Sequence, residues 1–325
     1  MERIISEKLI KIVKQKKILS MIFSLFRTFI LIGLGFVLLY PLLYMISVSF
    51  RASEDLLDPL VVWIPKNLSI ENIQLALQVI KYKTSAINSI KVSILGSIFT
   101  TMTASLVGYS FARFKFKFKG LLFSIVIFSI VVPPQVTMLP TYNYLRNFDF
   151  LGIGQLIGLI TGNDLTINMI DTVWAIIIPA MTGVGIRGGL FIYIFRQFFR
   201  NMPKELEDAA YIDGYGPFGT FVKVMLPNAG SGYLTSFLFS LVWFWNDYIN
   251  TSLLYNTNRT LSMNLSSINS IIDTMRNSNS VAYSMYEVLG AKQGACLLFI
   301  LPILAVYIVL QKYFTESIER TGIVG

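Results

Sequence analysis

Residues 203–227 read PKELEDAAYIDGYGPFGTFVKVMLP, a polar stretch that separates two long apolar ones. Pro203 suits the start of a helix, and acids crowd the first turn that follows, where the helix dipole favours negative charge. Gly214 ends this helix, Pro217 begins a second short one, and Pro227 closes it. The stretch therefore predicts a helical hairpin with its own start and stop signals.

Composition places the rest of the chain in a membrane. Of the 325 residues, 54% are hydrophobic and only 14% are charged, whereas soluble domains contain about 25% charged residues. Apolar stretches long enough to cross a bilayer recur along the chain. We expect an all-α polytopic protein with six membrane helices, at 28–50, 88–112, 120–142, 172–198, 231–255 and 289–313. Three prolines in the third (Pro133, Pro134 and Pro140) predict a kink or a break there.

Basic residues give the expected sidedness. Seven of the 27 Lys and Arg residues lie in the first 27 positions, and four more form RFKFKFK at 113–119. With the N-terminus inside, 17 lie in inner segments and seven in outer ones, which supports an N-in, C-in topology. The hairpin at 203–227 is then cytoplasmic. Basic blocks beside apolar spans are this orientation signal, so they do not indicate nucleic-acid binding.

Three segments follow from this pattern. Residues 1–27 form a basic amphipathic cytoplasmic tail, residues 28–84 a first membrane helix with its outer loop, and residues 85–325 the main transmembrane domain. The outer loop at 143–171 is Gly-rich and partly apolar, which fits either a segment that enters the membrane edge or one that packs on the bundle. The outer loop at 256–288 is rich in Asn and Ser and reads as a solvated connector.

Several kinds of chemistry are excluded by residues that the sequence lacks. It has no His and a single Cys, Cys296, so an intrachain disulfide, a His/Cys zinc site and a His-dependent triad are ruled out. No GxxxxGK[ST] phosphate loop occurs, so any ATP hydrolysis belongs to another polypeptide. A secondary transporter driven by protons or sodium would need carboxylates within its spans, and the clear spans contain almost none.

The hairpin resembles the cytoplasmic signature of binding-protein-dependent ABC import permeases. That signature reads Glu-Ala-Ala, three residues, Gly, nine residues, then Ile-x-Leu-Pro, and here Asp208-Ala209-Ala210, Gly214 and 224–227 keep both spacings. The surrounding ELEDAAYIDG and the later FLFSLVWFWNDYINTSLLY are similar to the carbohydrate branch, in particular to the shorter permease of maltose-type importers. Asp208 and Val224 depart from the signature by one methylene each.

This resemblance implies a function and a set of partners. The hairpin would be a coupling helix that docks in a groove of an ATPase subunit. The partners would be a second permease, two ATPase subunits that bind ATP and Mg, and an extracellular solute-binding protein, at the bacterial inner membrane. The chain itself would bind no cofactor and would not be an enzyme. The residues implied in docking are Glu205, Glu207, Asp208, Ala209, Ala210, Asp213, Gly214 and Pro227. The outer loop at 256–288 would meet the binding protein.

Candidate pathway residues come from charges and aromatics within the spans. Arg187, flanked by glycines, either pairs with a carbonyl or an acid such as Asp171, or faces the pathway and favours an anionic sugar. In the fifth helix, Trp243, Trp245, Asn246 and Asp247 suit sugar faces and hydroxyls. Membrane-interface anchoring explains the two Trp residues equally well.

The sequence leaves open whether the substrate is a sugar or another solute. We expect a sugar or oligosaccharide, and Arg187 suggests an acidic one. An ABC permease for a non-sugar solute is the main alternative, and an ion-coupled secondary transporter is the weaker one.

Overall fold

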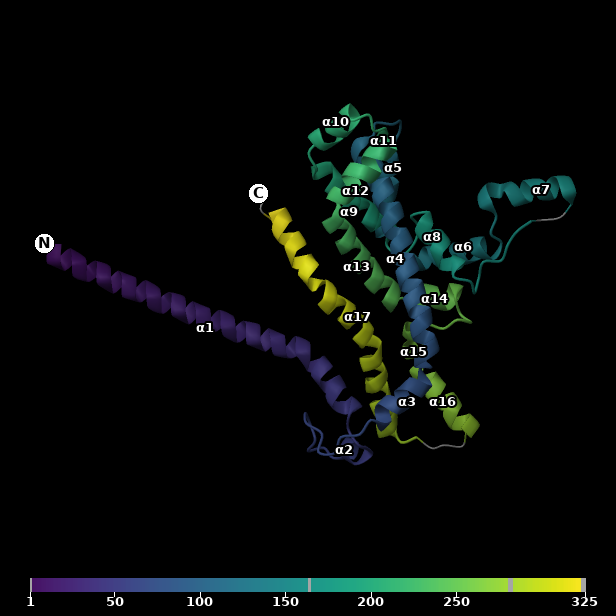
Figure 1. Cartoon of the computed structure of the whole chain (residues 1–325). Helices are drawn as coiled ribbons and strands as arrows, with labels where there is room; N and C mark the ends of the chain where they lie inside the picture. The colour runs from purple at the N-terminus through teal and green to yellow at the C-terminus, as the bar shows by residue number, and fades with distance from the viewer. Residues whose placement is uncertain (1, 163–164, 280–282, 323–325) are drawn as a thin grey trace. The chain divides into compact units, whose positions relative to one another are not determined.

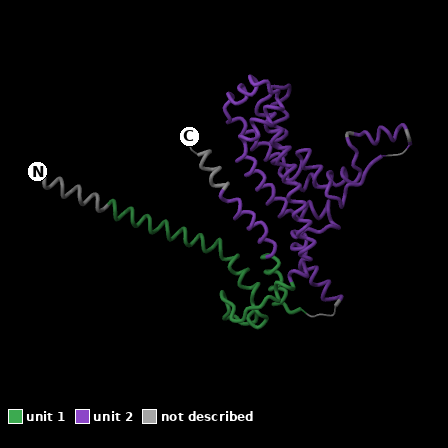
Figure 2. The backbone as a smooth tube through the Cα atoms, viewed as in Figure 1, with its two compact units in different colours: residues 1–75, 283–297 green, residues 76–282, 298–325 purple. Residues whose placement is uncertain are grey.

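The computed structural model describes residues 2–162, 165–279 and 283–322 (Figure 1). The regular secondary structure of these residues is helical, and two isolated backbone bridges join extended residues. The chain divides into two compact units, one of residues 1–75 and 283–297 and the other of residues 76–282 and 298–325 (Figure 2).

The first unit begins with one long helix, α1 (Glu2–Ser49), which runs without interruption through the expected boundary at residue 27. The structure does not describe the side chains of residues 1–15, so the expected amphipathic face of the tail falls outside the described part of the protein. A short helix, α2 (Ser53–Leu57), follows. The unit also holds the start of α3 (Glu71–Val79) and that of α17 (Met285–Gly322).

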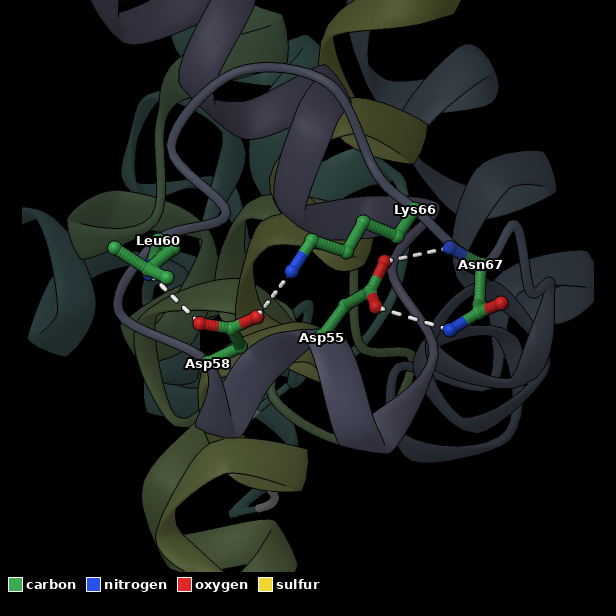
Figure 3. Close-up of polar contacts among 5 residues, drawn as sticks. All are labelled: Asp55, Asp58, Leu60, Lys66 and Asn67. Carbon is green, nitrogen blue, oxygen red and sulfur yellow. Dashed lines mark hydrogen bonds and ion pairs between the residues drawn. The ribbon is translucent and has the colours of Figure 1, made fainter.

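Polar contacts fold the loop after α1 back on itself (Figure 3). The carboxylate of Asp55 accepts hydrogen bonds from the backbone N–H of Asn67 at 2.7 Å and from its side-chain amide at 3.2 Å. Lys66 pairs with Asp58 at 2.6 Å. Arg51 donates to the carbonyl of Val62 at 2.7 Å. The loop is therefore held in place by its own polar contacts.

The second unit is built around α4 (Tyr82–Arg113), which packs against α8, α9 and α13. Besides the later part of α17, the helices of this unit after α4 are α5 (Lys119–Val131), α6 (Pro134–Arg146), α7 (Ile153–Thr161), α8 (Trp174–Met181), α9 (Gly188–Asn201), α10 (Glu205–Ile212), α11 (Pro217–Thr220), α12 (Leu226–Asn228), α13 (Gly230–Asn246), α14 (Ile249–Leu254), α15 (Leu261–Ser266) and α16 (Ile268–Asn279). A 3-10 turn (Phe150–Gly152) precedes α7, and a π-helical turn (Phe221–Met225) joins α11 to α12.

Three helical stretches are long and apolar enough to cross a membrane among the described residues: 16–49, 82–113 and 285–312. They overlap the first, second and sixth expected spans. The third expected span is the bent pair α5 and α6, whose axes differ by 106° at Val132 and Pro133. The break that its prolines predicted is confirmed. The count of six spans and the N-in, C-in topology stay predictions.

Two expected spans are not continuous helices. The segment 172–198 is broken between α8 and α9, where Gly183 (φ 79°) and Arg187 (φ 56°) adopt left-handed backbone conformations. The segment 231–255 is broken after α13, where Asp247 is extended. The expectation of a single helix is wrong in both places. The overall hydropathy of each segment suggested one span, whereas the breaks are made by the backbone conformation of a few residues.

Small residues let α4 approach its neighbours closely. A methyl group built on Gly96 would lie 2.7 Å from the ring of Phe244, and one built on Gly108 would lie 2.9 Å from the backbone N of Arg196. Several α4 hydroxyl residues are also fully buried, including Ser93, Ser97 and Thr100. Small residues on α4 therefore allow close packing of its neighbouring helices.

Gly108→Ala is expected to destabilise the protein, because the added methyl meets backbone atoms of α9 that have little room to move. Overpacking of this kind costs about 1–3 kcal/mol. Gly230→Ala is the matched control, because a methyl there has no neighbour within 4 Å. Thermal unfolding in detergent measures both. Equal thermal unfolding midpoints for the two variants would show that α4 and α9 leave room for a methyl group at Gly108.

Candidate functional site

The hairpin at 203–227 begins with α10, whose end is built by a glycine. The N–H of Tyr215 donates to the carbonyl of Ala210 at 3.0 Å, and the N–H of Gly214 donates to that of Tyr211 at 3.1 Å. This pair of bonds is a Schellman motif, which needs a left-handed residue between helix and turn. Gly214 supplies it with φ 83°. The predicted glycine stop and the second helix at Pro217 are confirmed, whereas the first helix begins at Glu205, two residues after Pro203.

Pro227 does not close the second helix of the hairpin. Helical backbone runs from α11 through the π-helical turn into α12, and Pro227 lies inside α12. Only a turn at Ala229 separates α12 from α13. Within this continuous helical run, Pro227 directly follows the π-helical turn, in which the N–H of Leu226 donates to the carbonyl of Phe221.

The exposed face of α10 contains part of the expected docking set. Glu205, Asp208 and Ala209 are exposed on α10, and Asp213 and Gly214 follow at its end. Two bulky apolar side chains extend this surface: Ile212 is 86% exposed and Phe218 is 70% exposed. The docking surface is defined here as Glu205, Asp208, Ala209, Ile212, Asp213 and Phe218. Acids beside exposed apolar residues suit a basic, partly apolar groove on a partner.

Glu207 and Ala210 face the other way. Ala210 is 2% exposed and Glu207 is 9% exposed. The carboxylate of Glu207 lies 3.4 Å from Nε of Arg113, the last residue of α4. Arg113 also donates to the carbonyl of Met202 at 2.7 Å, just before the hairpin. Glu207 therefore has a partner inside the protein, and its direct contact with an ATPase stays a prediction.

Aromatic packing joins the hairpin to the helices above it. The ring of Tyr109 on α4 lies 5.4 Å from Phe199 on α9 and 5.0 Å from Phe221 in the hairpin. All three side chains are buried. With the Arg113 contacts, this cluster makes α4, the end of α9 and the hairpin one connected block, visible at one end of the second unit (Figure 1). A displacement of the hairpin would move α4 with it.

Arg187 lies at the break between α8 and α9. It is exposed, and its guanidinium lies 5.6 Å from the ring centre of Trp243 on α13. Asp171, the acid considered as its partner, instead accepts a hydrogen bond from the N–H of Thr257 at 2.8 Å. Trp243 in turn packs edge-on against Phe191 at 5.3 Å. The guanidinium of Arg187 thus lies over an aromatic ring, and among the described residues no carboxylate forms an ion pair with it.

The remaining pathway candidates on α13 differ in availability. Trp245 is 4% exposed and donates its indole N–H to the carbonyl of Phe299 at 3.2 Å, so it is a packing residue. The carboxylate of Asp247 accepts from the N–H groups of Asn250 and Thr251, which satisfies the start of α14. Asn246 is exposed, although its side chain donates to the carbonyl of Val242. Of this set, Asn246 and Trp243 keep surface that could meet a solute.

Sequence reasoning missed Arg113 and Phe218. Arg113 opens the RFKFKFK run and was counted only as a signal of sidedness. Its position as the first residue of that run, directly at the end of an apolar span, was the available clue. Phe218 sits directly after Pro217, where an apolar residue in a polar hairpin indicates a contact surface.

Comparison with known proteins decides the family. The family of binding-protein-dependent transport system inner membrane components matches residues 104–320. The chain belongs to this family. It is therefore a multi-pass inner membrane component of a transport system, and the match includes the whole hairpin and both breaks described above.

Two proteins that are similar to this chain are named as permeases of sugar transport systems. The chain is 26% identical over 315 residues to the arabinooligosaccharides transport system permease protein AraQ of Halalkalibacterium halodurans, covering 96% of this chain and 99% of that one. It is 25% identical to the lactose transport system permease protein LacG of Rhizobium radiobacter, covering 71% of each.

A solved structure has the same fold. A crystal structure of a bacterial ABC transporter involved in the import of the acidic polysaccharide alginate contains a chain with a TM-score of 0.69 and 20% identity. The likeness covers 90% of this chain and 96% of that one.

Proposed function

We propose that this family member is a permease subunit of an ATP-driven importer for sugars or oligosaccharides. It forms half of the translocation pathway, beside a second permease. Two separate ATPase subunits bind ATP and Mg, and an extracellular solute-binding protein delivers the solute. Six spans with both termini inside place the hairpin in the cytoplasm, where the ATPase subunits are. The names of the relatives support the sugar assignment.

The observation that carries the proposal is the two-sided construction of the hairpin. Its outer side, the docking surface, exposes acids and bulky apolar residues that have no packing role within the described chain. Its inner side holds Glu207 against Arg113 of α4. An element that is exposed on one side and fixed to the central helix on the other suits the transfer of a rigid-body motion.

Coupled flux tests the proposal. The complex that co-purifies with the chain is reconstituted into proteoliposomes, and uptake of labelled arabino-, malto- and uronate oligosaccharides is measured with binding protein present. Uptake that requires ATP and survives collapse of proton and sodium gradients is expected. Uptake that follows an ion gradient without ATP would identify a secondary transporter, and ATP-driven uptake of amino acids or phosphate alone would identify a non-sugar importer.

A narrower proposal concerns the charge of the solute. Arg187 is an exposed cation at a helix break beside Trp243, an arrangement that can hold a sugar ring and its carboxylate together. We propose that it favours acidic oligosaccharides such as uronates. The asparagine and tryptophan nearby, Asn246 and Trp243, offer neutral contacts.

Arg187→Gln is expected to lower uptake of an acidic oligosaccharide relative to its neutral counterpart. A hydrogen bond to a charged group contributes about 1.5–3 kcal/mol, so the preference should fall by about tenfold or more. Arg146→Gln, which removes an exposed cation at the end of α6, is the matched control. An unchanged ratio of acidic to neutral uptake in Arg187→Gln would remove this assignment.

A further inference from the structure

Three basic side chains gather where α5 and α9 pack together. Lys119 is the first residue of α5, and Arg196 and Arg200 lie four residues apart on one face of the last turns of α9. α5 packs against α9, and the guanidinium of Arg196 lies over the ring of Phe123, one helical turn after Lys119. Lys119, Arg196 and Arg200 are called the basic cluster below.

The cluster is not neutralised by this chain. The connecting residues 114–118, α5 and α9 contain no Asp or Glu. Lys119 donates to the carbonyl of Phe114 at 2.8 Å. In the part of the chain that the structure describes, no carboxylate pairs with any member of the cluster. Like charges that are held together without a counter-charge favour an anion from outside.

Arg196 is fixed in position by a ring rather than by an acid. Its guanidinium lies 3.9 Å from the centre of the Phe123 ring, and Phe123 stacks on Tyr193 at 6.4 Å. The Nε atom of Arg196 is buried and has no hydrogen-bond partner. Because this atom is covered by protein, an external phosphate can bind Arg196 only through the terminal nitrogens of its guanidinium group.

The surroundings of the cluster are apolar and exposed. Phe118 is 73% exposed, Leu121 is 62% exposed and Phe116 is 39% exposed. Lys115 and Lys117 alternate with these phenylalanines and are exposed as well. Aromatic and aliphatic side chains beside Lys and Arg are typical of surfaces that lie at the lipid headgroup level. A small soluble anion would make no favourable contact with these exposed apolar side chains, whereas the acyl chains of a lipid would.

We propose that the basic cluster binds the phosphate of an anionic phospholipid, with its acyl chains against the exposed face of α5. Arg196 and Arg200 present guanidinium forks to the phosphate oxygens, and Lys119 adds a point charge. The start of α5 has no side-chain cap, so its positive helix end adds to the same field. Lys119 is hydrogen-bonded to the carbonyl of Phe114, the residue after Arg113, so the bound lipid would stabilise the end of α4 that holds the hairpin.

Native mass spectrometry of the purified full chain, with the subunits that accompany it, tests this site. The probes are dioleoyl phosphatidylglycerol, dioleoyl phosphatidylcholine and inorganic phosphate. Phosphatidylglycerol is expected to bind more tightly than phosphatidylcholine. Arg196→Gln/Arg200→Gln should weaken phosphatidylglycerol binding about tenfold or more, since each cation adds appreciably to attraction for anionic lipid.

Two further variants keep the outcome interpretable. Arg200→Gln alone changes an exposed residue, so it should fold even if the double variant does not, and a several-fold loss is expected. Arg276→Gln removes an exposed cation on α16 and should bind lipid as wild type does. Equal binding of the two lipids, or an equal loss in Arg276→Gln, would overturn the site. Displacement of phosphatidylglycerol by millimolar inorganic phosphate would overturn the lipid assignment and indicate a soluble phosphate ligand.

Discussion

Arg113→Met is expected to destabilise the protein by about 3–5 kcal/mol, the cost of removing one partner from a buried ion pair. The substitution leaves the carboxylate of Glu207 buried without its counter-charge, and it removes the donor to the carbonyl of Met202. Both losses fall at the junction between α4 and the hairpin. A lower unfolding midpoint in detergent, with coupling lost even at temperatures where the protein stays folded, is the expected result.

A double variant separates the ion pair from general damage. In Arg113→Met/Glu207→Met both charges are gone, so the variant should be more stable than Arg113→Met alone. Lys204→Met removes an exposed cation from the same segment and should change stability by less than about 0.5 kcal/mol. If Arg113→Met has the same unfolding midpoint as the wild type, the contact between Arg113 and Glu207 does not contribute to stability. The ion pair would then not hold α4 to the hairpin.

Gly214→Pro is expected to abolish ligand-stimulated ATP hydrolysis while leaving the membrane helices assembled. Proline fixes φ near −65°, whereas Gly214 has φ 83°, and proline lacks the N–H that Gly214 donates to Tyr211. The Schellman motif cannot form, so α10 and α11 lose their relative placement. ATPase activity of the purified complex, with and without binding protein and sugar, measures the effect.

Gly216→Ala is the matched control for this variant. Gly216 lies two residues away in the same turn, but its φ is −74° and a methyl there has no neighbour within 4 Å. It should retain stimulated hydrolysis. Loss of stimulation in Gly216→Ala would mean that the turn is sensitive to any change, and full stimulation in Gly214→Pro would mean that the hairpin does not couple.

The local features of the hairpin could be predicted from sequence because short-range rules determine them. Proline and glycine restrict the backbone at their own positions, so Pro203, Gly214 and Pro217 give the starts and the stop of the helices. The prolines of the third expected span broke it for the same reason. Such signals need no knowledge of what packs against the segment.

Long-range contacts could not be predicted in this way. Glu207 and Asp208 are adjacent acids, and which of them turns inward depends on where Arg113 lies in space. The break at Arg187 was hidden because apolar residues continue on both sides of it. Asp247 looked like a solute contact, yet its carboxylate is needed by the N–H groups that the break after α13 leaves without partners.

Site-directed cross-linking tests most directly the claim that the docking surface meets a separate ATPase. Cys296 is replaced by serine, and Ala209→Cys or, as a control at the far end of the second unit, Asn269→Cys on α16 is introduced (Figure 1). A short bifunctional reagent is then added to membranes that contain the assembled complex. The account predicts an adduct between the Ala209→Cys chain and an ATPase subunit, and none from Asn269→Cys. No ATPase adduct from Ala209→Cys, in a complex that hydrolyses ATP, would contradict it.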